Sequence, residues 1–475
     1  MSDPLTPDAL NEKVKAVFGR LAIDKRRLPS SQLNRRSVPA YVAEWVLENV
    51  APGEGPVTPA ELEKIQTWAN RFLPLPDDSK IIRNRLMNGE VVKVLTPVEV
   101  EIVLTKRKRE RVAQLKLLGL PDVEIADGLV EQYPDLLKQG MWGVVELTDT
   151  QEGIALTSFK PMQASVNLEI YKEKRAAFTL EEWRALLLNS MGYNPWKFDQ
   201  REKTYLLCRL LPLVEKNLHL LELAPKGTGK SYLYENINPR VRLLSGGNVS
   251  PAVLFVNNAS GQWGLLARFA VVVLDEVQTL RFEKPEEIVG GLKGFLANGK
   301  LTRGGMYETA SPASLVMLAN IALDSEQRPI NTLLVKELPE FLRETAFLDR
   351  LRGIIPGWKV RKLSGDSFSQ GMGLKSDFFG DALLALREDI TANQYAQNTI
   401  TLAGEKRYKR NEDAVRLLAS ALMKLQFPHG RVSPEDFETY CLRPAIELRQ
   451  LVWEQLYRLD AEYRQYDEEI RVAQQ

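Results

Sequence analysis

The spacing of hydrophobic residues changes along the chain, and the first 85 residues have the spacing of helices. Apolar positions recur as on one face of a helix over residues 8–21 and 38–50. A third helix is predicted to start after Thr58 and to run to about Phe72. Its start has a threonine at the N-cap, a proline at the first helical position and Glu61 at the third, the pattern of a capping box. This part of the chain is expected to form a helical unit.

Between about residues 89 and 173 the period shortens to two, which is typical of strands with one buried face. Apolar and polar residues alternate over residues 91–95, 98–104, 144–148 and 164–170. Helical pieces are expected near residues 129–138. The pattern predicts a small antiparallel β domain, for which an OB-like barrel is the leading candidate. That fold often binds nucleic acid.

Three later segments, residues 220–223, 270–274 and 314–319, are nearly continuous apolar runs. Such runs predict strands of a parallel sheet that is covered on both faces, as in α/β proteins. Beyond them the helical period returns over residues 376–389 and 411–425, with Asn411 as the expected N-cap. The last stretch opens at Ser433, and residues 457–475 are predicted to form a charged amphipathic helix.

The loop after the first apolar run has the sequence Ala-Pro-Lys-Gly-Thr-Gly-Lys-Ser at 224–231, which fits the strand–loop–helix layout of a P-loop. Glycines let the backbone turn its N–H groups around phosphates at a helix N-terminus. The lysine would neutralise the β- and γ-phosphates, and the serine hydroxyl would hold Mg²⁺. Ala224 replaces the usual first glycine, and a strand–turn–helix with chance glycines is the alternative. The predicted nucleotide-binding residues of this loop are Lys226, Gly227, Thr228, Gly229, Lys230 and Ser231.

Polar side chains also follow the other two runs. Asp275 can hold Mg²⁺ through water, and Glu276 can polarise the water that attacks the γ-phosphate. An acidic helix cap is the alternative explanation of the pair. Asn320 can hydrogen-bond the γ-phosphate or the attacking water, although an Asn after a strand is usually a turn residue.

This order of motifs at strand ends resembles the AAA+ ATPases, in which an arginine reaches the nucleotide of the neighbouring subunit. Arg350 is the candidate for that role, with Arg343 and Arg352 as weaker competitors and a surface salt bridge as the alternative. The resemblance also implies a lid arginine near the γ-phosphate, for which Arg416 is the candidate and Arg410 the rival. An arginine that acts in trans implies a ring or filament.

Two groups of basic residues are candidates for DNA contacts. The first is a dense basic run comprising Lys106, Arg107, Lys108 and Arg109. The second is Lys300 and Arg303, on a predicted hairpin within residues 294–307 that could contact phosphates without reading bases. Solvated charged faces explain both groups as well. Trp263 is a candidate stacking or channel residue, or a packed one.

Composition narrows the range of functions. The formal net charge is +1, with 44% hydrophobic and 26% charged residues, as in ordinary globular proteins. Apolar stretches fall short of the ~20 residues of a membrane span, and the N-terminus lacks an export signal. Cys208 and Cys441 are too few for a disulfide framework, which suits a cytoplasmic protein. With two histidines, a Cys/His zinc site and a Ser-His-Asp triad are both disfavoured.

Several separated motifs together resemble the BrxL family, the Lon-related AAA+ ATPases of bacterial BREX phage-defence systems. They are Ser-Val-Pro-Ala-Tyr-Val-Ala-Glu-Trp at 37–45, Gly-Met-Trp-Gly at 140–143, the loop at 224–231, Phe-Leu-Asp-Arg…Ile-Pro-Gly-Trp within 347–358, and Leu-Met-Lys-Leu-Gln-Phe-Pro-His-Gly at 422–430. The resemblance implies an ATP- and Mg²⁺-dependent ring, hexameric and possibly stacked, on double-stranded DNA. It also implies other BREX proteins as partners and no membrane association.

The resemblance ends near the point where the family commonly continues into a Lon-type protease domain. The chain is therefore expected to be a short form without protease activity. The expected domains are 1–85 (helical, basic, DNA-binding), 86–175 (β-rich, OB-like), 176–365 (AAA+ α/β core) and 366–475 (helical lid and C-terminal helices). The expected function is ATP-dependent translocation on DNA or DNA remodelling. The alternatives are a Lon-like protein unfoldase that serves a separate protease, and a static nucleotide-dependent DNA clamp.

Overall fold

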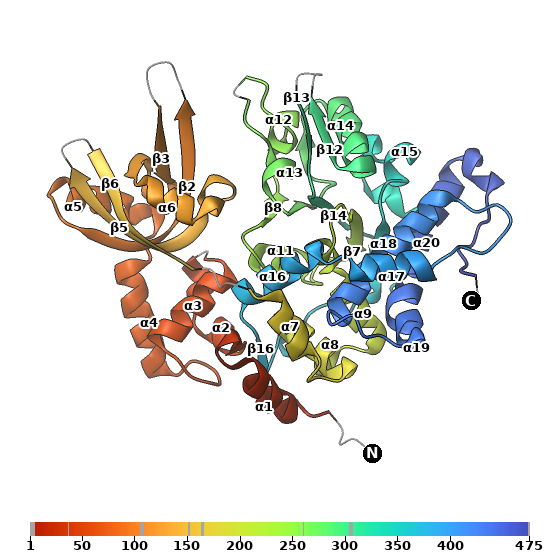
Figure 1. The fold of residues 1–475 in the computed structure, drawn as a ribbon, viewed down its shortest axis with the longest axis horizontal. Coiled ribbons are helices and arrows are strands. Elements are labelled where there is room, and N and C mark those ends of the chain that lie inside the picture. Colours follow the sequence, from red (N-terminus) through yellow and green to blue (C-terminus); the bar gives the residue numbers. More distant parts are fainter. Residues whose placement is uncertain are drawn as a thin grey trace. The chain divides into compact units, whose positions relative to one another are not determined.

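The computed structural model describes residues 5–36, 38–104, 109–150, 153–162, 166–259, 261–303 and 307–473 (Figure 1). The chain forms two compact units. The first, here called the sheet unit, comprises Met1–Ala22, Ser165–Leu374 and Phe378–Gln475; the second, the barrel unit, comprises Ile23–Ala164 and Lys375–Asp377. The expected segments 1–85 and 86–175 do not coincide with these units, because Met1–Ala22 and residues 165–175 belong to the sheet unit.

The core of the sheet unit is a five-stranded sheet in which all paired strands run parallel. Its order is β15 (Gly353–Pro356), β7 (Leu220–Ala224), β14 (Ser314–Asn320), β10 (Val271–Asp275) and β8 (Val241–Ser245). Every residue of β7, β10 and β15 is buried, which explains why the strands read as apolar runs and not as alternating patterns. The three strands predicted from those runs are confirmed, and the mixed α/β class is correct.

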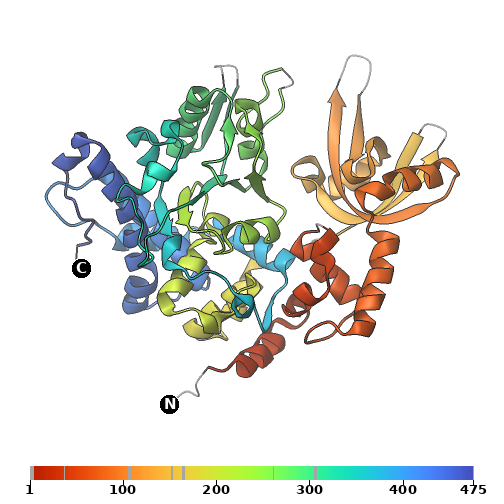
Figure 2. The same ribbon diagram turned by 180° about the vertical axis from the view of Figure 1, so that it is seen from behind.

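Helices and short strands surround this sheet (Figure 2). The helices are α1 (Pro7–Phe18), α7 (Leu168–Arg175), α8 (Leu180–Ser190), α9 (Gln200–Cys208), α10 (Leu211–Val214), α11 (Lys230–Asn236), α12 (Pro251–Leu254), α13 (Leu265–Arg268), α14 (Pro285–Asn298), α15 (Thr345–Leu348), α16 (Ser376–Ala385), α17 (Thr391–Thr399), α18 (Lys409–Gln426), α19 (Pro434–Phe437) and α20 (Arg443–Leu459). The short strands are β9 (Asn248–Val249), β11 (Arg281–Phe282), β12 (Lys300–Arg303), β13 (Tyr307–Ala310) and β16 (Met372–Leu374). Within the described ranges, no helix has both the length and the apolarity to cross a bilayer.

Three predictions about the sheet unit are wrong. In each case a polar side chain makes a hydrogen bond that the sequence pattern did not indicate. Residues 168–170 begin helix α7, since the side chain of Asn167 caps it by accepting from the N–H groups of the second and third residues that follow. Asn411 is not an N-cap, because it lies inside α18 and accepts a hydrogen bond from buried Arg449. The final helix ends at Leu459, after which Asp460 caps a short 3₁₀ turn.

The barrel unit contains a closed five-stranded barrel with a helical segment before it in the sequence. Its elements are β1 (Ala22–Asp24), α2 (Arg27–Ser30), α3 (Ala40–Val50), α4 (Pro59–Phe72), α5 (Ser79–Met87), β2 (Val92–Leu104), β3 (Arg109–Leu115), β4 (Leu120–Ile125), α6 (Asp127–Gln132), β5 (Met141–Thr150) and β6 (Gly153–Pro161). The order around the barrel is β2-β3-β4-β6-β5, and β4–β6 is a parallel pair among antiparallel ones. The two predicted strands at 91–95 and 98–104 are one continuous strand, β2 (Figure 1).

A local sequence signal located the start of α4 correctly, and the start of α8 has the same signal. Helix α4 begins with the predicted capping box between Thr58 and Glu61, and α8 begins with the same motif between Thr179 and Glu182. In each box the threonine hydroxyl satisfies a free N–H of the first turn while the glutamate bonds back to the N-cap. These short-range bonds explain why such starts are readable from sequence.

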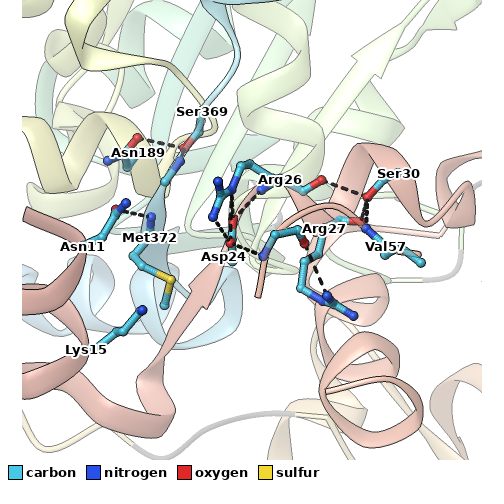
Figure 3. Close-up of polar contacts among 12 residues, drawn as sticks. Asn11, Lys15, Asp24, Arg26, Arg27, Ser30, Val57, Asn189, Ser369 and Met372 are labelled. Carbon is cyan, nitrogen blue, oxygen red and sulfur yellow. Dashed lines mark hydrogen bonds and ion pairs between the residues drawn. The ribbon is translucent and has the colours of Figure 1, made fainter. Parts of the chain in front are cut away.

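Each unit also has its own polar ties between loops and helices (Figure 3). In the sheet unit, the N–H of Met372 donates to Asn11 of α1 at 2.8 Å. In the barrel unit, the Asp24 carboxylate accepts from Arg26 at 2.6 Å, and Val57 N–H donates to the Ser30 hydroxyl at 2.8 Å. These bonds fix the position of segments that connect the helices and strands.

Candidate nucleotide-binding site

The predicted site residues lie at the carboxyl edge of adjacent strands in the sheet. Strand β14 lies between β7 and β10, and Asn320 pairs with Ala224, which is the last residue of β7 and the first of the predicted P-loop. Asp275 ends β10 on the other side of β14. In open parallel sheets this edge is where ligands bind. The fold thus brings the three predicted motifs together.

A chain of hydrogen bonds connects these motifs. The ammonium of Lys230 donates to the Asn320 amide oxygen at 2.9 Å, and the Asn320 amide nitrogen donates to the Glu276 carboxylate at 3.4 Å. Lys230 is only 7% exposed, and burial lowers its pKa while Glu222 and Asp275 act in the opposite direction. A buried ammonium of this kind is suited to an anionic ligand.

The backbone holds Glu276 in an unusual conformation. Its φ of 45° lies in the left-handed region, which non-glycine residues seldom adopt. Its N–H donates to the Asp275 carboxylate at 2.9 Å, and its carbonyl accepts from Thr279 N–H at 2.7 Å. Strain of this kind is retained where the surroundings fix it, which is common at functional sites.

The loop between β7 and α11 requires its glycines. Gly227 and Gly229 have φ values of 87° and 72°, and Gly229 is the N-cap of α11. A Cβ on Gly229 would lie 2.6 Å from Leu363 Cδ1 and 3.0 Å from the Tyr193 hydroxyl. The conformation and the crowding both exclude larger residues at this position.

The donor set suits magnesium. Ser231 follows Lys230 at the start of α11, and Asp275 is 5% exposed. A hydroxyl and a carboxylate are oxygen ligands, which Mg²⁺ prefers. In the same loop, Thr228 is buried and donates to the Pro225 carbonyl at 3.3 Å, whereas Lys226 is exposed. Lys226 is therefore the loop residue with the weakest structural connection to the site.

Beneath the loop lies a buried ionic group that the sequence analysis missed. Arg209 and Glu222 are both fully buried and pair at 2.6 Å, and Arg209 also donates to the Tyr193 hydroxyl at 2.9 Å. The signal was Glu222 itself, a charged residue inside the apolar run of β7. A charge at such a position needs a buried partner.

The predicted trans-acting arginine, Arg350, lies two residues after the end of α15. Its guanidinium donates to the carbonyl of Ala346 in that helix. Of its two competitors, Arg343 donates to the carbonyls of Leu338 and Lys336, and Arg352 is largely buried with its pKa lowered to about 10 by burial and then by nearby Arg449. Arg350 remains the candidate for a role toward a neighbouring subunit.

The two candidate lid arginines are both bonded to other groups of the sheet unit. Arg416 donates to the Ile400 carbonyl at 2.6 and 2.9 Å and pairs with Glu412 at 2.8 Å. Arg410 pairs with buried Asp349. The structure does not bring either arginine to Lys230, and a γ-phosphate role for Arg416 requires that it leave these partners.

The candidate DNA contacts are less well defined. The predicted hairpin is confirmed as β12 and β13, where Lys300 pairs with Glu308 at 2.5 Å and both side chains are exposed. Lys106, Arg107 and Lys108 lie outside the described residues, between β2 and β3. Arg303 and Arg109 lie at strand ends, with only their backbones described.

Two curated relatives resemble most of the chain. The "Lon-like protease BrxL" of Escherichia coli O9:H4 is 31% identical over 431 residues, which cover 89% of this chain and 61% of the relative. The protein of the same name from Bacillus cereus H3081.97 is 29% identical over 460 residues, covering 95% of this chain and 67% of the relative. The chain thus spans about three fifths of the length of the first relative and two thirds of the second.

Among solved structures, a full-length MCM homolog from Methanopyrus kandleri aligns with 95% of this chain and 99% of its own, at 15% identity and a TM-score of 0.39. A score of that size does not establish a common fold. Family comparisons are more specific. Residues 16–148 match "BREX system Lon protease-like protein BrxL N-terminal", and residues 154–469 match "Lon-like protease BrxL-like, ATPase domain". The site residues from Lys226 to Arg416 all fall within the second match, and the chain belongs to the BrxL family.

Proposed function

We propose that the chain is a Mg²⁺-dependent ATPase. The observation that carries this proposal is the connected set of Lys230, Asn320 and Glu276 at one edge of the parallel sheet, beside a glycine loop. The buried cation would neutralise the phosphates, the amide would position the γ-phosphate or the attacking water, and the carboxylate would activate that water. The match to an ATPase domain supports the same reading.

Each residue has a distinct part in this proposal. When ATP binds, the Lys230 ammonium leaves the Asn320 oxygen and bonds to a phosphate oxygen, whose negative charge neutralises it. Asn320 then orients the γ-phosphate or the water, and Glu276 polarises that water as a general base. Ser231 and Asp275 would hold Mg²⁺, Asp275 through water. Bound ATP supplies the phosphoanhydride bond that is cleaved.

We propose further that the active form is a ring in which Arg350 acts on the nucleotide of the next subunit. Its Nε is buried without a hydrogen-bond partner among the described residues, so the guanidinium is incompletely satisfied within one chain. A guanidinium can spread over several phosphate oxygens and stabilise developing charge. A hexamer, single or stacked, is the expected assembly.

Double-stranded DNA is the proposed substrate of the ring. The strand order of the barrel, its one parallel pair β4–β6 and the helix α6 between the third and fourth strands support an OB-type barrel. The basic run at 105–109 connects the first two strands, which is one of the loops that such barrels use for nucleic acid. Lys300 and Arg303 are proposed as further phosphate contacts in the sheet unit.

The BREX system named in the N-terminal family match supports a role in defence against phage, with other BREX proteins as partners. In that role ATP hydrolysis would move or remodel DNA. The relatives' name, "Lon-like protease", favours a second candidate, a protein unfoldase that serves a protease. In that case Trp263→Ala abolishes unfolding of a test protein and spares DNA binding.

The test is ATP hydrolysis by wild type and Glu276→Gln, with and without duplex DNA at two salt concentrations. We expect DNA to stimulate wild type, the stimulation to fall steeply with salt, and the variant to bind ATP without turnover. ATP turnover that ignores DNA would contradict the DNA proposal. Full phage defence by Glu276→Gln would favour a static clamp over a motor.

A further inference from the structure

Three consecutive carbonyl oxygens of the P-loop are each held by a different segment of the sheet unit. The donors are Leu363 N–H to Gly227 O at 2.8 Å, Arg209 Nη1 to Thr228 O at 3.0 Å, and the Tyr193 hydroxyl to Gly229 O at 3.1 Å. Tyr193 lies in the connection between α8 and α9, Arg209 is the C-cap of α9, and Leu363 follows β15. The loop backbone is thus fixed by residues outside the recognised motif.

These bonds determine where the loop's N–H groups point. In a planar trans peptide, the C=O and the N–H of the same unit point in opposite directions. When the carbonyls of Gly227, Thr228 and Gly229 face their donors, the next N–H groups along the chain face away from them. Those N–H groups belong to Thr228, Gly229 and Lys230, which a phosphate-binding loop uses for its ligand.

Arg209 is at the centre of this arrangement. Its guanidinium makes three contacts of 2.6–3.1 Å with Glu222 and one each with Tyr193 and Thr228, and it is completely buried. Burial also raises the pKa of Tyr193, so that its hydroxyl stays protonated and can donate to the Gly229 carbonyl. The planar fork of arginine fits several partners at fixed angles, which a lysine ammonium does not.

The same ion pair affects the P-loop lysine. Glu222 is the largest of the influences that raise the pKa of Lys230 against the effect of burial, and Arg209 opposes it. Because Arg209 satisfies the Glu222 carboxylate directly, that carboxylate does not compete with a phosphate for Lys230. The buried pair therefore acts on both the backbone and the charged side chain of the loop.

We propose that Arg209 and Tyr193 are positioning residues of the nucleotide site, which hold the loop in the conformation that binds the β- and γ-phosphates. The proposal rests on the proposed ATPase function and goes beyond it, because neither residue belongs to a P-loop motif. Both act through the loop backbone and touch no reacting atom. Their effect is therefore specific to phosphates and should not extend to the nucleoside.

The test uses Tyr193→Phe in the full chain, with Tyr234→Phe as the matched control. Tyr193→Phe keeps the ring, which packs edge-on against Phe198, and removes the bond to the loop. The Tyr234 hydroxyl is equally buried and donates at 2.9 Å to the Arg209 carbonyl, not to the loop. Affinities for Mg²⁺-ATP, Mg²⁺-ADP and adenosine are measured by competition, together with the melting temperature of each variant.

We expect Tyr193→Phe to weaken the binding of ATP and of ADP roughly three- to tenfold, because one hydrogen bond that holds the loop is lost. Adenosine affinity should stay unchanged, and Tyr234→Phe should bind all three ligands like wild type. Arg209→Lys, which keeps the charge beside Glu222 without the fork, should weaken ATP further. If either altered protein binds ATP like wild type while folded, or if Tyr234→Phe loses as much affinity, the positioning role is wrong.

Failure of the underlying ATPase proposal gives a different result. In that case wild type itself takes up no Mg²⁺-ATP, or Lys230→Ala binds it equally well. A wild type that binds ATP through Lys230, with Tyr193→Phe unaffected, contradicts the positioning role alone.

Discussion

The candidate nucleotide site of the sheet unit and the outer face of the barrel hold their charges in opposite ways. In the sheet unit, Arg209, Glu222 and Lys230 are at most 7% exposed, and each is bonded to another member of the site or its support. In the barrel unit, Lys93 and Glu146 face each other across β2 and β5 at 2.9 Å with side chains 49% and 37% exposed. The charges of the first set are shielded from water, whereas those of the second set are exposed to it.

This difference in burial separates the charges that a binding site can depend on from those that contribute little. A buried charge is costly unless it is paired, so its position is fixed by the fold and its partners are specific. An exposed pair such as Lys116–Glu99, at 2.7 Å, contributes little and is screened by salt. The proposed ATP site would therefore depend on single residues, whereas DNA binding would depend on many weak contacts.

Breaking one ion pair in each unit gives the largest contrast. Arg209→Met leaves Glu222 buried without a partner and should lower the free energy of unfolding by about 3–5 kcal/mol. Lys93→Met in the exposed cross-strand pair should lower it by less than about 1 kcal/mol. Urea denaturation measures both, and Arg209→Met combined with Glu222→Leu should recover part of the loss. Equal losses in the two single variants would contradict the comparison.

A second variant tests the buried site itself, by removing Asn320, which connects Lys230 to Glu276 through hydrogen bonds. Asn320→Ala should reduce the ATP hydrolysis rate about 100-fold, the effect of losing one preorganised donor, while ATP affinity changes less than tenfold. Steady-state kinetics and nucleotide titration provide the two values. An unchanged rate would show that the observed hydrogen bonds are not part of the hydrolysis site.

A smaller effect is expected at the start of α4 in the barrel unit. The Thr58 N–H and hydroxyl, and then Arg27, donate to the Glu61 carboxylate and lower its pKa to about 2 from 4.5. Because the folded pKa is the lower one, the ionised carboxylate adds stability above pH 4.5, and this is lost as pH falls toward 2. The stability difference between wild type and Glu61→Gln should therefore shrink between pH 5 and 3. A difference independent of pH would contradict it.

The smallest effect concerns the hairpin of β12 and β13. Glu308 pairs with Lys300 and raises the pKa of the ammonium, so this acid competes with DNA phosphates for the lysine. Glu308→Gln should raise the affinity for duplex DNA about two- to threefold at low salt and steepen the salt dependence. Fluorescence anisotropy over a salt series measures this. Weaker binding by Glu308→Gln would exclude Lys300 as a phosphate contact.

Sequence patterns predicted what depends on neighbours along the chain or on full burial. The cap at Thr58, the buried strands and the polar residues at their ends are of this kind, because each has a short-range or one-dimensional signature. The pairing of Glu222 with Arg209 was missed because its partner lies on another element. The course of residues 460–473 was missed for a similar reason, since Trp453 donates to the Asp467 carbonyl and the chain leaves the helix.

Alternation alone was the least reliable signal. Residues 164–170 have the same apolar period as the barrel strands, yet Asn167 caps a helix there. The basic run at 105–109 was readable only as a set of charges, and pairs such as Arg111–Asp127 show how acids elsewhere on the barrel can neutralise such residues. The spacing of the residues does not separate a strand from a capped helix, nor a free basic residue from a paired one.

Calorimetry of Mg²⁺-ATP binding to the full chain, with Lys230→Ala as the comparison, tests the proposed nucleotide site most directly. We expect saturable uptake by wild type and at least a hundredfold weaker binding by the variant, because the variant lacks the buried ammonium at the phosphates. Absence of ATP uptake by folded wild type, or equal binding by Lys230→Ala, would contradict the proposed site.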